Sequence, residues 1–286
     1  MSEKTQIVVE DEQQIEDAAQ KALQIASSQK QQGFSVPTEL ISLPSQGKIY
    51  PKISPLHNLT EVEVRHLIAP DEDILTSRSL IRSGKMIDAL LANCITNKTI
   101  RPEDMIAGDK NAIMVFLRVS GYTSDYDVTL QCPLCSEQNI KWTFDLSKLE
   151  MNVLELEPVS EGENRFEYTL PSGNVVQFKF LSSREEREIT EAQESLKKKT
   201  NMVIDKGVTT RFKKQLLSVN GVEDQKTINM FVDSMRATDS RAFRKHLAEH
   251  DPDVIFKQDF TCSVCGGTKE VDVPITAEFF WPDTGV

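Results

Sequence analysis

Apolar and polar residues alternate in two stretches of the chain that lie 114 residues apart. The alternating positions are Val62, Val64 and His66 in one stretch and Val176, Phe178 and Phe180 in the other. A period of two residues is typical of a strand that buries one face. We therefore expect a half-buried strand at each place, giving way to a helix that follows it.

A period near 3.6 residues replaces this alternation further along the chain. Ile87, Leu90, Leu91, Cys94 and Ile95 lie at i, i+3, i+4, i+7 and i+8, which places them on one face of a helix. Cys94 is then expected to be a small apolar group of the core rather than a nucleophile.

Three segments stand outside these patterns. Residues 1–36 carry a weak apolar stripe, too thin for a lone helix in water, so we expect an arm that is mobile or bound to a partner. Residues 183–200 are almost wholly polar and indicate a surface helix, or one that another subunit covers. Phe279, Phe280 and Trp281 are expected to plug the core, or otherwise to contact a neighbouring protein.

The sequence also repeats itself, because residues 105–135 align without a gap onto residues 235–265. The identical pairs are Met105 and Met235, Ala107 and Ala237, Asp109 and Asp239, Ala112 and Ala242, Leu117 and Leu247, Cys132 and Cys262, and Cys135 and Cys265. Each copy predicts a helix that begins near Asp109 or Asp239, with that aspartate as its N-cap. A strand then enters a cysteine pair, and another strand leaves it.

Each earlier strand also follows a Leu-Pro-Ser turn, at 43–45 and at 170–172. The chain thus reads as a polar arm at 1–36, a first repeat at 37–158 and a second repeat at 159–286. The expected fold class is α+β, with two tandem strand–helices–strand units. Because each unit supplies half of a cysteine site, we expect that site to join them.

Four of the five cysteines form two C-x2-C pairs, Cys132 with Cys135 and Cys262 with Cys265. Such a pair turns both thiolates toward one metal ion, and two pairs complete the tetrahedral shell of a structural zinc site. The 126 residues between the pairs are many more than a compact zinc ribbon has. A redox pair, a disulfide framework and ordinary buried thiols are the alternatives. We expect one shared structural Zn²⁺, since four thiolates leave no open position for substrate.

Composition and charge restrict the classes of partner that we expect. The chain of 286 residues has a formal net charge of −11, which disfavours the basic face that a duplex-binding protein offers to phosphates. No apolar run is long enough to span a membrane, and the acidic N-terminus lacks the basic and apolar regions of a signal peptide. We therefore expect a protein of the cytoplasm without nucleic acid as its main partner.

Catalytic signatures are missing from the sequence. It has no glycine-rich phosphate loop, no H-E-x-x-H and no G-x-S-x-G. The histidines make no catalytic set, and we expect His66 and His246 to be structural. His246 and His250 have the i, i+4 spacing of two metal ligands, but no third ligand is evident. The acidic run 71–73 fits a helix start, where negative charge complements the dipole.

Several stretches resemble the T4-type phage baseplate hub family. They are LPSQGKIYP at 43–51, APDEDILTSRSL at 69–80, AGDKNAIMVFLRVSGYTSDYDVTLQCPLC at 107–135 and the closing FFWP. The resemblance covers roughly residues 40–286 and includes Arg118, Gly121 and Tyr122 ahead of the first cysteine pair. Shorter members hold one such unit, whereas this chain holds two, and its second half lacks the Arg-x-x-Gly-Tyr stretch.

The resemblance implies a non-enzymatic component or assembly factor of the baseplate hub of a contractile phage tail. Its partners would be other baseplate and tail hub proteins, with no small-molecule substrate. It would act in the cytoplasm of the infected host and then be part of the virion. Two other classes stay open: a zinc-ribbon regulator that works with nucleic-acid machinery, and a metal-dependent or thiol enzyme.

Overall fold

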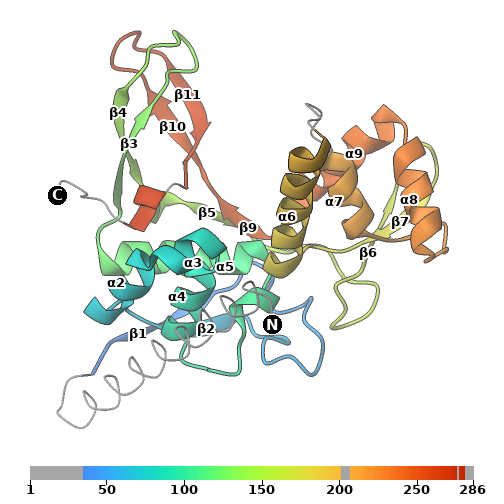
Figure 1. The fold of residues 1–286 in the computed structure, drawn as a ribbon, viewed down its shortest axis with the longest axis horizontal. Helices are drawn as coiled ribbons and strands as arrows, with labels where there is room; N and C mark the ends of the chain where they lie inside the picture. Colours follow the sequence, from blue (N-terminus) through green and yellow to red (C-terminus); the bar gives the residue numbers. More distant parts are fainter. Residues whose placement is uncertain (1–34, 201–206, 276, 281–286) are drawn as a thin grey trace.

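A computed structural model of the chain describes residues 35–200, 207–275 and 277–280 (Figure 1). Within these residues the structure is α+β, with eight α-helices, α2 to α9, and five small sheets of two or three strands. No helix among them combines the length and the apolar character needed to cross a membrane.

The body of the first half is a strand pair covered by helices. Strands β1 (Thr38–Ser42) and β2 (Glu61–Arg65) are antiparallel, and Val62 and Val64 face the core while the intervening residues are exposed. The helices that follow are α2 (Ala69–Thr76), α3 (Arg78–Ser83), α4 (Met86–Cys94), the 3-10 helix η1 (Pro102–Asp104) and α5 (Ala107–Gly121). The strand and the helical face expected around Cys94 are thus confirmed.

The body of the second half also consists of strands and helices. Strands β6 (Phe166–Thr169) and β7 (Val175–Phe178) form a hairpin, and β8 (Leu216–Val219) pairs with the other edge of β7. The helices are α6 (Ser183–Thr200), α7 (Gly207–Gln215), α8 (Gln225–Ser234) and α9 (Ala237–His250). The polar stretch at 183–200 is therefore helical, as expected from its sequence.

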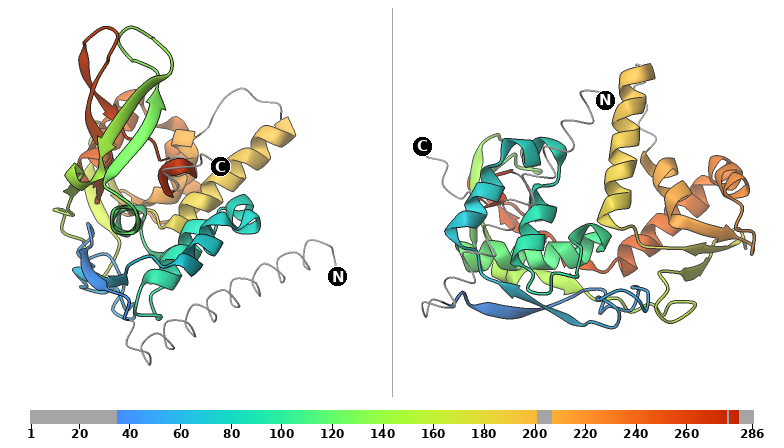
Figure 2. Two further views of the ribbon diagram at one scale, coloured as in Figure 1. Left: turned by 90° about the vertical axis from the view of Figure 1, so that its left-hand side faces the viewer. Right: turned by 60° about the horizontal axis from the view of Figure 1, so that its bottom comes forward.

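Two hairpins rise together from these bodies. One consists of β3 (Asp125–Leu130) and β4 (Ile140–Asp145), and the other of β10 (Lys257–Thr261) and β11 (Thr268–Asp272). Figure 1 and the left-hand view of Figure 2 agree that they lie side by side and project away from the helices. We call these two hairpins with their turns the ribbon arm.

The two halves meet below the ribbon arm through backbone contacts. The 3-10 helix η2 (Leu146–Lys148) leads into β5 (Glu150–Asn152), which pairs antiparallel with β9 (Asp253–Ile255). Gly108 lies so close to the second half that a Cβ there would stand 1.8 Å from the carbonyl oxygen of Pro252. Asn111 adds a 2.9 Å hydrogen bond to the Asp253 carboxylate. This contact needs glycine at position 108, because any side chain would meet backbone.

Charged groups add a second contact between the halves. The Asp88 carboxylate on α4 pairs with Lys110 on α5 and with Arg187 on α6. Arg184 on α6 pairs with Asp104 at 2.7 Å, and the amide of Ser183 donates to the carbonyl of Met105 at 3.0 Å. The start of helix α6 is thus attached to the first half, and a single cluster of buried apolar residues extends through both bodies.

The expected N-caps were wrong. Helix α5 begins at Ala107 with Ile106 as its N-cap, and α9 begins at Ala237 with Arg236 as its N-cap. Asp109 and Asp239 lie inside the first turn and are buried. Instead of capping its own helix, each aspartate accepts a hydrogen bond from the serine amide of the Leu-Pro-Ser turn in its half.

The predictions for the two ends of the chain are confirmed only for part of the C-terminal end. The 3-10 helix η3 (Ala277–Phe280) buries Phe279 and Phe280, and the ring of Phe279 meets that of Tyr126 edge to face at 5.4 Å. The core plug is confirmed for these two residues. Trp281 and nearly all of the arm predicted at 1–36 lie outside the described residues.

Candidate metal centre

The cysteine pairs occupy the turns at the free end of the ribbon arm. In the first turn the amide of Cys132 donates to the carbonyl of Glu137 at 2.8 Å, and the amide of Ser136 donates to the carbonyl of Cys132 at 2.9 Å. The second turn repeats both bonds, from Cys262 to Gly267 at 3.0 Å and from Gly266 to Cys262 at 2.9 Å. The two turns are therefore closed by the same backbone pattern.

Both turns also require a left-handed residue directly after the second cysteine. Gly266 has a φ of 68°, which glycine adopts without strain. The equivalent residue of the first turn is Ser136, with a φ of 63°. A side chain there is unfavourable, because its Cβ crowds the backbone in this conformation.

The four sulfur atoms of these turns converge on one point. Cys132 Sγ lies 3.9 Å from Cys265 Sγ, Cys135 Sγ lies 3.8 Å from Cys262 Sγ, and all four lie within 4.8 Å of one another. Zn–S bonds of about 2.3 Å place the corners of a tetrahedron roughly 3.8 Å apart. The residues therefore fit Zn²⁺, and these separations are far longer than the ~2.05 Å of a disulfide bond.

Hydrogen bonds favour the thiolate form at one corner of this cluster. The amides of Cys135 and Leu134 each lie 3.4 Å from Cys132 Sγ. These bonds, that of Cys135 first, lower the pKa of Cys132 to about 6. Although the amide of Glu137 lowers the pKa of Cys135, its neighbouring thiols prevail and raise it to about 12. Cys132 and Cys135 therefore do not both ionise readily on their own, and a bound dication would supply the missing positive charge.

The ribbon arm has a small core of its own just below the sulfur cluster. It consists of Cys132, Ile140, Phe260 and Cys262, flanked by Leu130, Trp142 and Val271. Trp142 of one hairpin meets Phe260 of the other edge to face, with ring centroids 5.3 Å apart. Such aromatic contacts add about 1 kcal/mol to the burial itself. The hairpins are therefore positioned by packing as well as by the sulfur cluster.

Arg118 and Gly121, which belong to the family-like stretch, fix the base of the first hairpin. The guanidinium of Arg118 is fully buried and donates to the carbonyl oxygens of Thr123 and Asp125. It also lies over the ring of Tyr122, 5.6 Å from the centroid. A Cβ at Gly121 would collide with the Leu67 side chain at 2.6 Å. The end of helix α5 is thereby joined to the start of β3.

The other residues considered for chemistry are built into the body. Cys94 is fully buried, and burial raises the pKa of its thiol to about 12. His66 contacts Glu39 at 2.7 Å, and His246 stacks on Tyr168 with ring centroids 4.0 Å apart. Among the described residues, the four cysteines of the ribbon arm form the one group of three or more His, Cys, Asp or Glu side chains close enough for a metal ion.

The helix-dipole argument describes only part of the role of Asp71. Asp71 lies in the first turn of α2, as the helix-dipole argument expected, but it is fully buried. The Arg65 guanidinium binds it with two bonds of 2.7 and 2.8 Å, and Asn93 donates a third of 2.7 Å. The alternation of Val62 and Val64 would leave Arg65 exposed, so the sequence pattern gives no signal for this buried pair.

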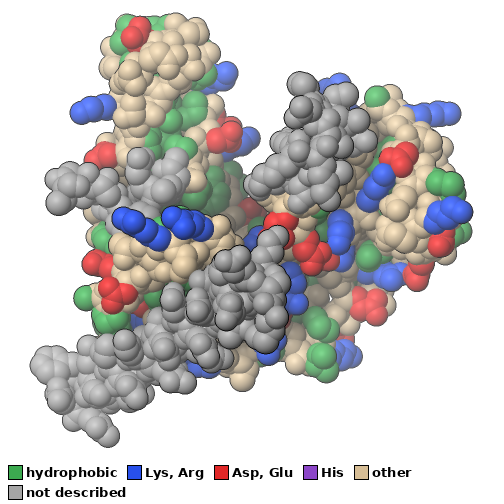
Figure 3. All heavy atoms as spheres, viewed as in Figure 1, with side chains coloured by type: hydrophobic (Ala, Val, Ile, Leu, Met, Phe, Trp, Pro, Cys, Tyr) green, Lys and Arg blue, Asp and Glu red, His purple; other side chains and the backbone are tan. Residues whose placement is uncertain are grey.

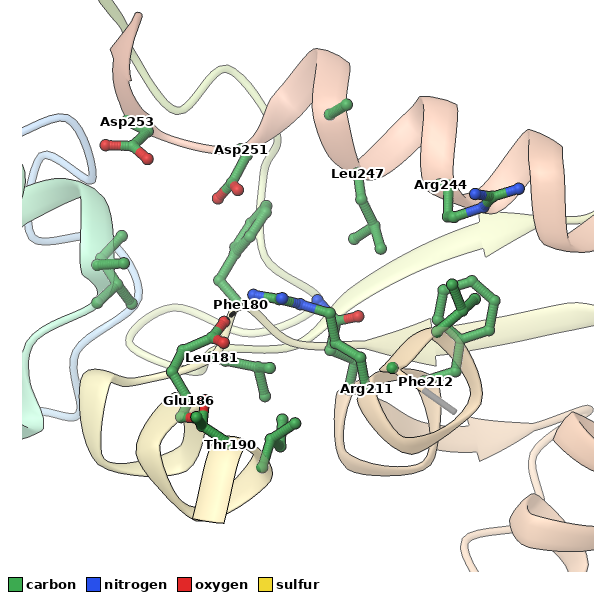
Figure 4. A pocket seen from close by; sticks show the side chains of 17 residues that line it. Phe180, Leu181, Glu186, Thr190, Arg211, Phe212, Arg244, Leu247, Asp251 and Asp253 are labelled. Atoms are coloured by element: carbon green, nitrogen blue, oxygen red, sulfur yellow. Dashed lines mark hydrogen bonds and ion pairs between the residues drawn. The ribbon is translucent and has the colours of Figure 1, made fainter. Parts of the chain in front are cut away.

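A pocket of about 950 Å³ lies between the bodies, near helices α6, α7 and α9. Figure 4 shows Phe180, Leu247 and Phe212 around it, with Arg211 reaching toward Glu186. Arg211 and Glu186 form an ion pair. Burial raises the pKa of Glu186 and the charge of Arg211 opposes this change. The acidic and basic side chains of the pocket neutralise each other in part, and its lining residues include no cysteine.

Comparison with known proteins completes this picture. The family model described as T4 bacteriophage base plate protein matches residues 38–281, which includes both bodies and the whole ribbon arm. No curated protein and no solved structure matches the chain. Because the match covers most of the sequence and all four clustered cysteines, this chain belongs to the T4 bacteriophage base plate protein family.

Proposed function

We propose that this protein is a non-catalytic structural component of the baseplate hub, in which one Zn²⁺ joins two copies of a duplicated unit. The observation that carries the proposal is the cluster of Cys132, Cys135, Cys262 and Cys265 at the separations of a tetrahedral zinc site. Family membership supports a structural role in the phage baseplate.

The duplication is supported by contacts that recur at equivalent positions of the two halves. The amide of Ser45 donates to Asp109 at 2.9 Å, and the amide of Ser172 donates to Asp239 at 3.0 Å. Each half also begins with a strand pair, continues with helices and ends in a cysteine-bearing hairpin, and the second half has the additional strand β8 between its helices. We place the halves at 37–158 and 159–286, with an arm at 1–36 that serves as a contact for partners.

The donor set favours a structural over a catalytic metal. Four thiolates fill the coordination shell of Zn²⁺ and leave no position for a water or a substrate. The metal would instead hold the ends of two hairpins that start from different bodies. The protein would then act by contacts with other baseplate and tail hub proteins, first in the host cytoplasm during assembly and afterwards in the virion.

The metal part of the proposal is tested by elemental analysis of the purified full chain. We expect one zinc per chain, and Cys132→Ser should lower both the zinc content and the melting temperature, since a structural zinc contributes on the order of 10 kcal/mol. Cys94→Ala is the matched control for zinc content, because Cys94 lies in the core of the first half and outside the cluster. A folded wild-type chain without zinc would refute the metal site.

The baseplate role is tested in the phage itself. A stop codon early in this gene should leave tails without complete baseplates, and the wild-type gene supplied on a plasmid should restore them. Electron microscopy of particles from both infections gives the readout. Normal baseplates formed in the absence of the protein would refute the structural role.

A further inference from the structure

The pocket between the bodies has walls from both halves of the chain. Ile106 and Ala107 of the first half contribute to one side, and helices α6, α7 and α9 of the second half supply most of the rest. Its volume of about 950 Å³ lies within the range of about 300–1,000 Å³ that is typical of ligand-binding pockets. Figure 3 shows acidic and basic side chains next to each other between the bodies, at the foot of helix α6. The pocket therefore has the size and the charged groups of a binding site.

The charged groups of the pocket do not balance at the end where helix α9 leads into β9. Three carboxylates and two guanidinium groups line the pocket. Arg211 is already paired with Glu186. Arg244 points away from Asp251 in Figure 4, and its Nε donates to a carbonyl oxygen of its own helix at 3.4 Å. Asp251 and Asp253 therefore leave an excess of negative charge at this end.

Asp251 is the acidic residue that is best placed to meet a ligand. Its carboxylate accepts no hydrogen bond and forms no ion pair with the part of the chain that the structure describes. Figure 4 shows it pointing toward the pocket, and solvent still reaches it. Partial burial, with Asp253 nearby, raises the pKa of Asp251 to about 6. At neutral pH this carboxylate is thus an anion without a direct counter-ion.

Gln215 provides a second acceptor without a donor. It lines the pocket from helix α7, four residues after Arg211 and hence on the same face of that helix. Its side chain is 6% exposed, and its Oε1 receives no hydrogen bond from any described residue. A buried acceptor of this kind is costly unless a donor reaches it. This observation is independent of the carboxylates and also indicates a ligand that carries N–H groups.

We propose that the pocket binds a basic side chain from a segment of a neighbouring baseplate protein, with the cationic group on Asp251. The choice of partner rests on the proposed baseplate role. A lysine ammonium has three donors and an arginine guanidinium has five, so either could neutralise the carboxylate and also donate to an amide oxygen. The methylene stem and the apolar residues beside it would lie against Phe180, Phe212 and Leu247.

A metal ion fits this pocket less well than a basic side chain. Among the described residues, only the cysteines of the ribbon arm come close enough together to hold an ion. The Asp253 carboxylate is also engaged, since it accepts a 2.9 Å bond from Asn111. An anionic ligand would meet the excess of negative charge. The cationic side chain of a protein is thus the class that the charges, the free acceptors and the apolar walls favour together.

A photoreactive residue in the full chain identifies what enters the pocket. We place p-benzoylphenylalanine at Val208, which lines the pocket and is 41% exposed, irradiate the assembled tails and map the linked peptides by mass spectrometry. The matched control carries the same group at Val222, which is 45% exposed and is not one of the lining residues. We expect position 208, but not 222, to link to one other tail protein beside a lysine or arginine. Links to an acidic or uncharged segment, only to this chain, or to nothing would overturn the proposal.

A binding measurement tests the chemistry of the ligand without the phage. The zinc-loaded chain is titrated with acetyl-Phe-Arg-Leu-amide and followed by nuclear magnetic resonance, and the same peptide with citrulline in place of arginine is the uncharged control. Asp251→Asn should weaken binding of the arginine peptide at least ~10-fold, the effect of losing a charge-assisted hydrogen bond. Asp259→Asn, at an exposed carboxylate of the ribbon arm, should leave binding unchanged. Equal binding of both peptides, or none of either, would refute the proposed ligand class.

The same variant separates a binding role of Asp251 from a structural one. Because its pKa is raised in the folded chain, ionised Asp251 opposes folding at pH 7.5, and Asp251→Asn should not lower the melting temperature. A lower melting temperature would indicate that the carboxylate supports the fold instead. If the stop codon abolishes baseplates but Asp251→Asn leaves both the link from position 208 and peptide binding intact, the pocket proposal fails and the baseplate role stands. Normal baseplates without the protein would refute that role and leave the peptide result unaffected.

Discussion

The two halves of the chain share a turn-to-helix contact but complete it differently. In the first half Asp109 accepts bonds from the amide of Ser45 at 2.9 Å, from the Ser45 hydroxyl at 2.6 Å and from the Tyr50 hydroxyl at 2.6 Å. In the second half the equivalent Asp239 accepts a bond from the amide of Ser172 at 3.0 Å. The first half thus has a polar network within its core, whereas the second half obtains support from the first through helix α6 and strand β9.

Among substitutions that compare equivalent residues of the two halves, the largest effect is expected at this pair of aspartates. Asp109→Ala leaves three donors without their acceptor in a fully buried place, and an unpaired buried donor costs roughly 1–3 kcal/mol. We expect a loss of about 4 kcal/mol in the free energy of unfolding, against about 1 kcal/mol for Asp239→Ala. Urea denaturation of the two variants measures both. Equal losses would show that the additional bonds of the first half contribute nothing.

The next effect concerns Gly108, whose equivalent in the second half is the exposed Thr238. Gly108→Ala puts a methyl group into the backbone of Pro252 and should cost about 3 kcal/mol, as overpacking of a fixed contact does. Thr238→Ala should change the free energy of unfolding by less than about 0.5 kcal/mol. Thermal unfolding compares them, and a fully stable Gly108→Ala variant would mean that the halves do not meet here.

A smaller effect distinguishes the two cysteine turns. Ser136→Gly should stabilise the chain by up to about 1 kcal/mol, since it removes a side chain from a left-handed position. Gly266→Ser should cost about the same amount, because it adds one. The melting temperatures of the zinc-loaded variants provide the measurement. Shifts of the same sign would contradict the equivalence of the two turns.

The smallest effect is an expected absence of reaction. With a pKa near 12, the Cys94 thiol of the first half is almost wholly protonated at pH 8, and its burial blocks access. Iodoacetamide at pH 8 should leave Cys94 unmodified in the folded, zinc-loaded chain and modify it once guanidinium chloride unfolds the protein. Peptide mapping reads the result, and rapid modification of the folded chain would show that this core opens readily.

Sequence patterns predicted the elements that depend on local periodicity and spacing. The strand at Val62 and Val64, the helical face around Cys94 and the meeting of the four cysteines all appear in the structure. Convergence of two distant cysteine pairs could be anticipated because each pair supplies half of a tetrahedron.

The remaining features depend on tertiary contacts that leave no local signal. A buried aspartate in a first helical turn has the same sequence appearance as a cap, and only the approach of Ser45 and Tyr50 decides the role of Asp109. From its sequence alone, Gly108 is a residue that weakens its helix, whereas the structure shows that the carbonyl group of Pro252 occupies the place of a side chain. The pairing of β5 with β9 likewise links residues about a hundred positions apart.

The wide separation of the two cysteine pairs along the chain has a consequence for biosynthesis. Cys262 leaves the ribosome 130 residues after Cys132. At 5–20 residues per second, translation of that stretch takes roughly 6–26 s. Throughout this interval the cysteines of the first turn lack the second cysteine pair, and β5 still lacks the strand with which it pairs. The ribbon arm can therefore close only after the second half has been made, so a prematurely terminated chain cannot form the complete ribbon arm.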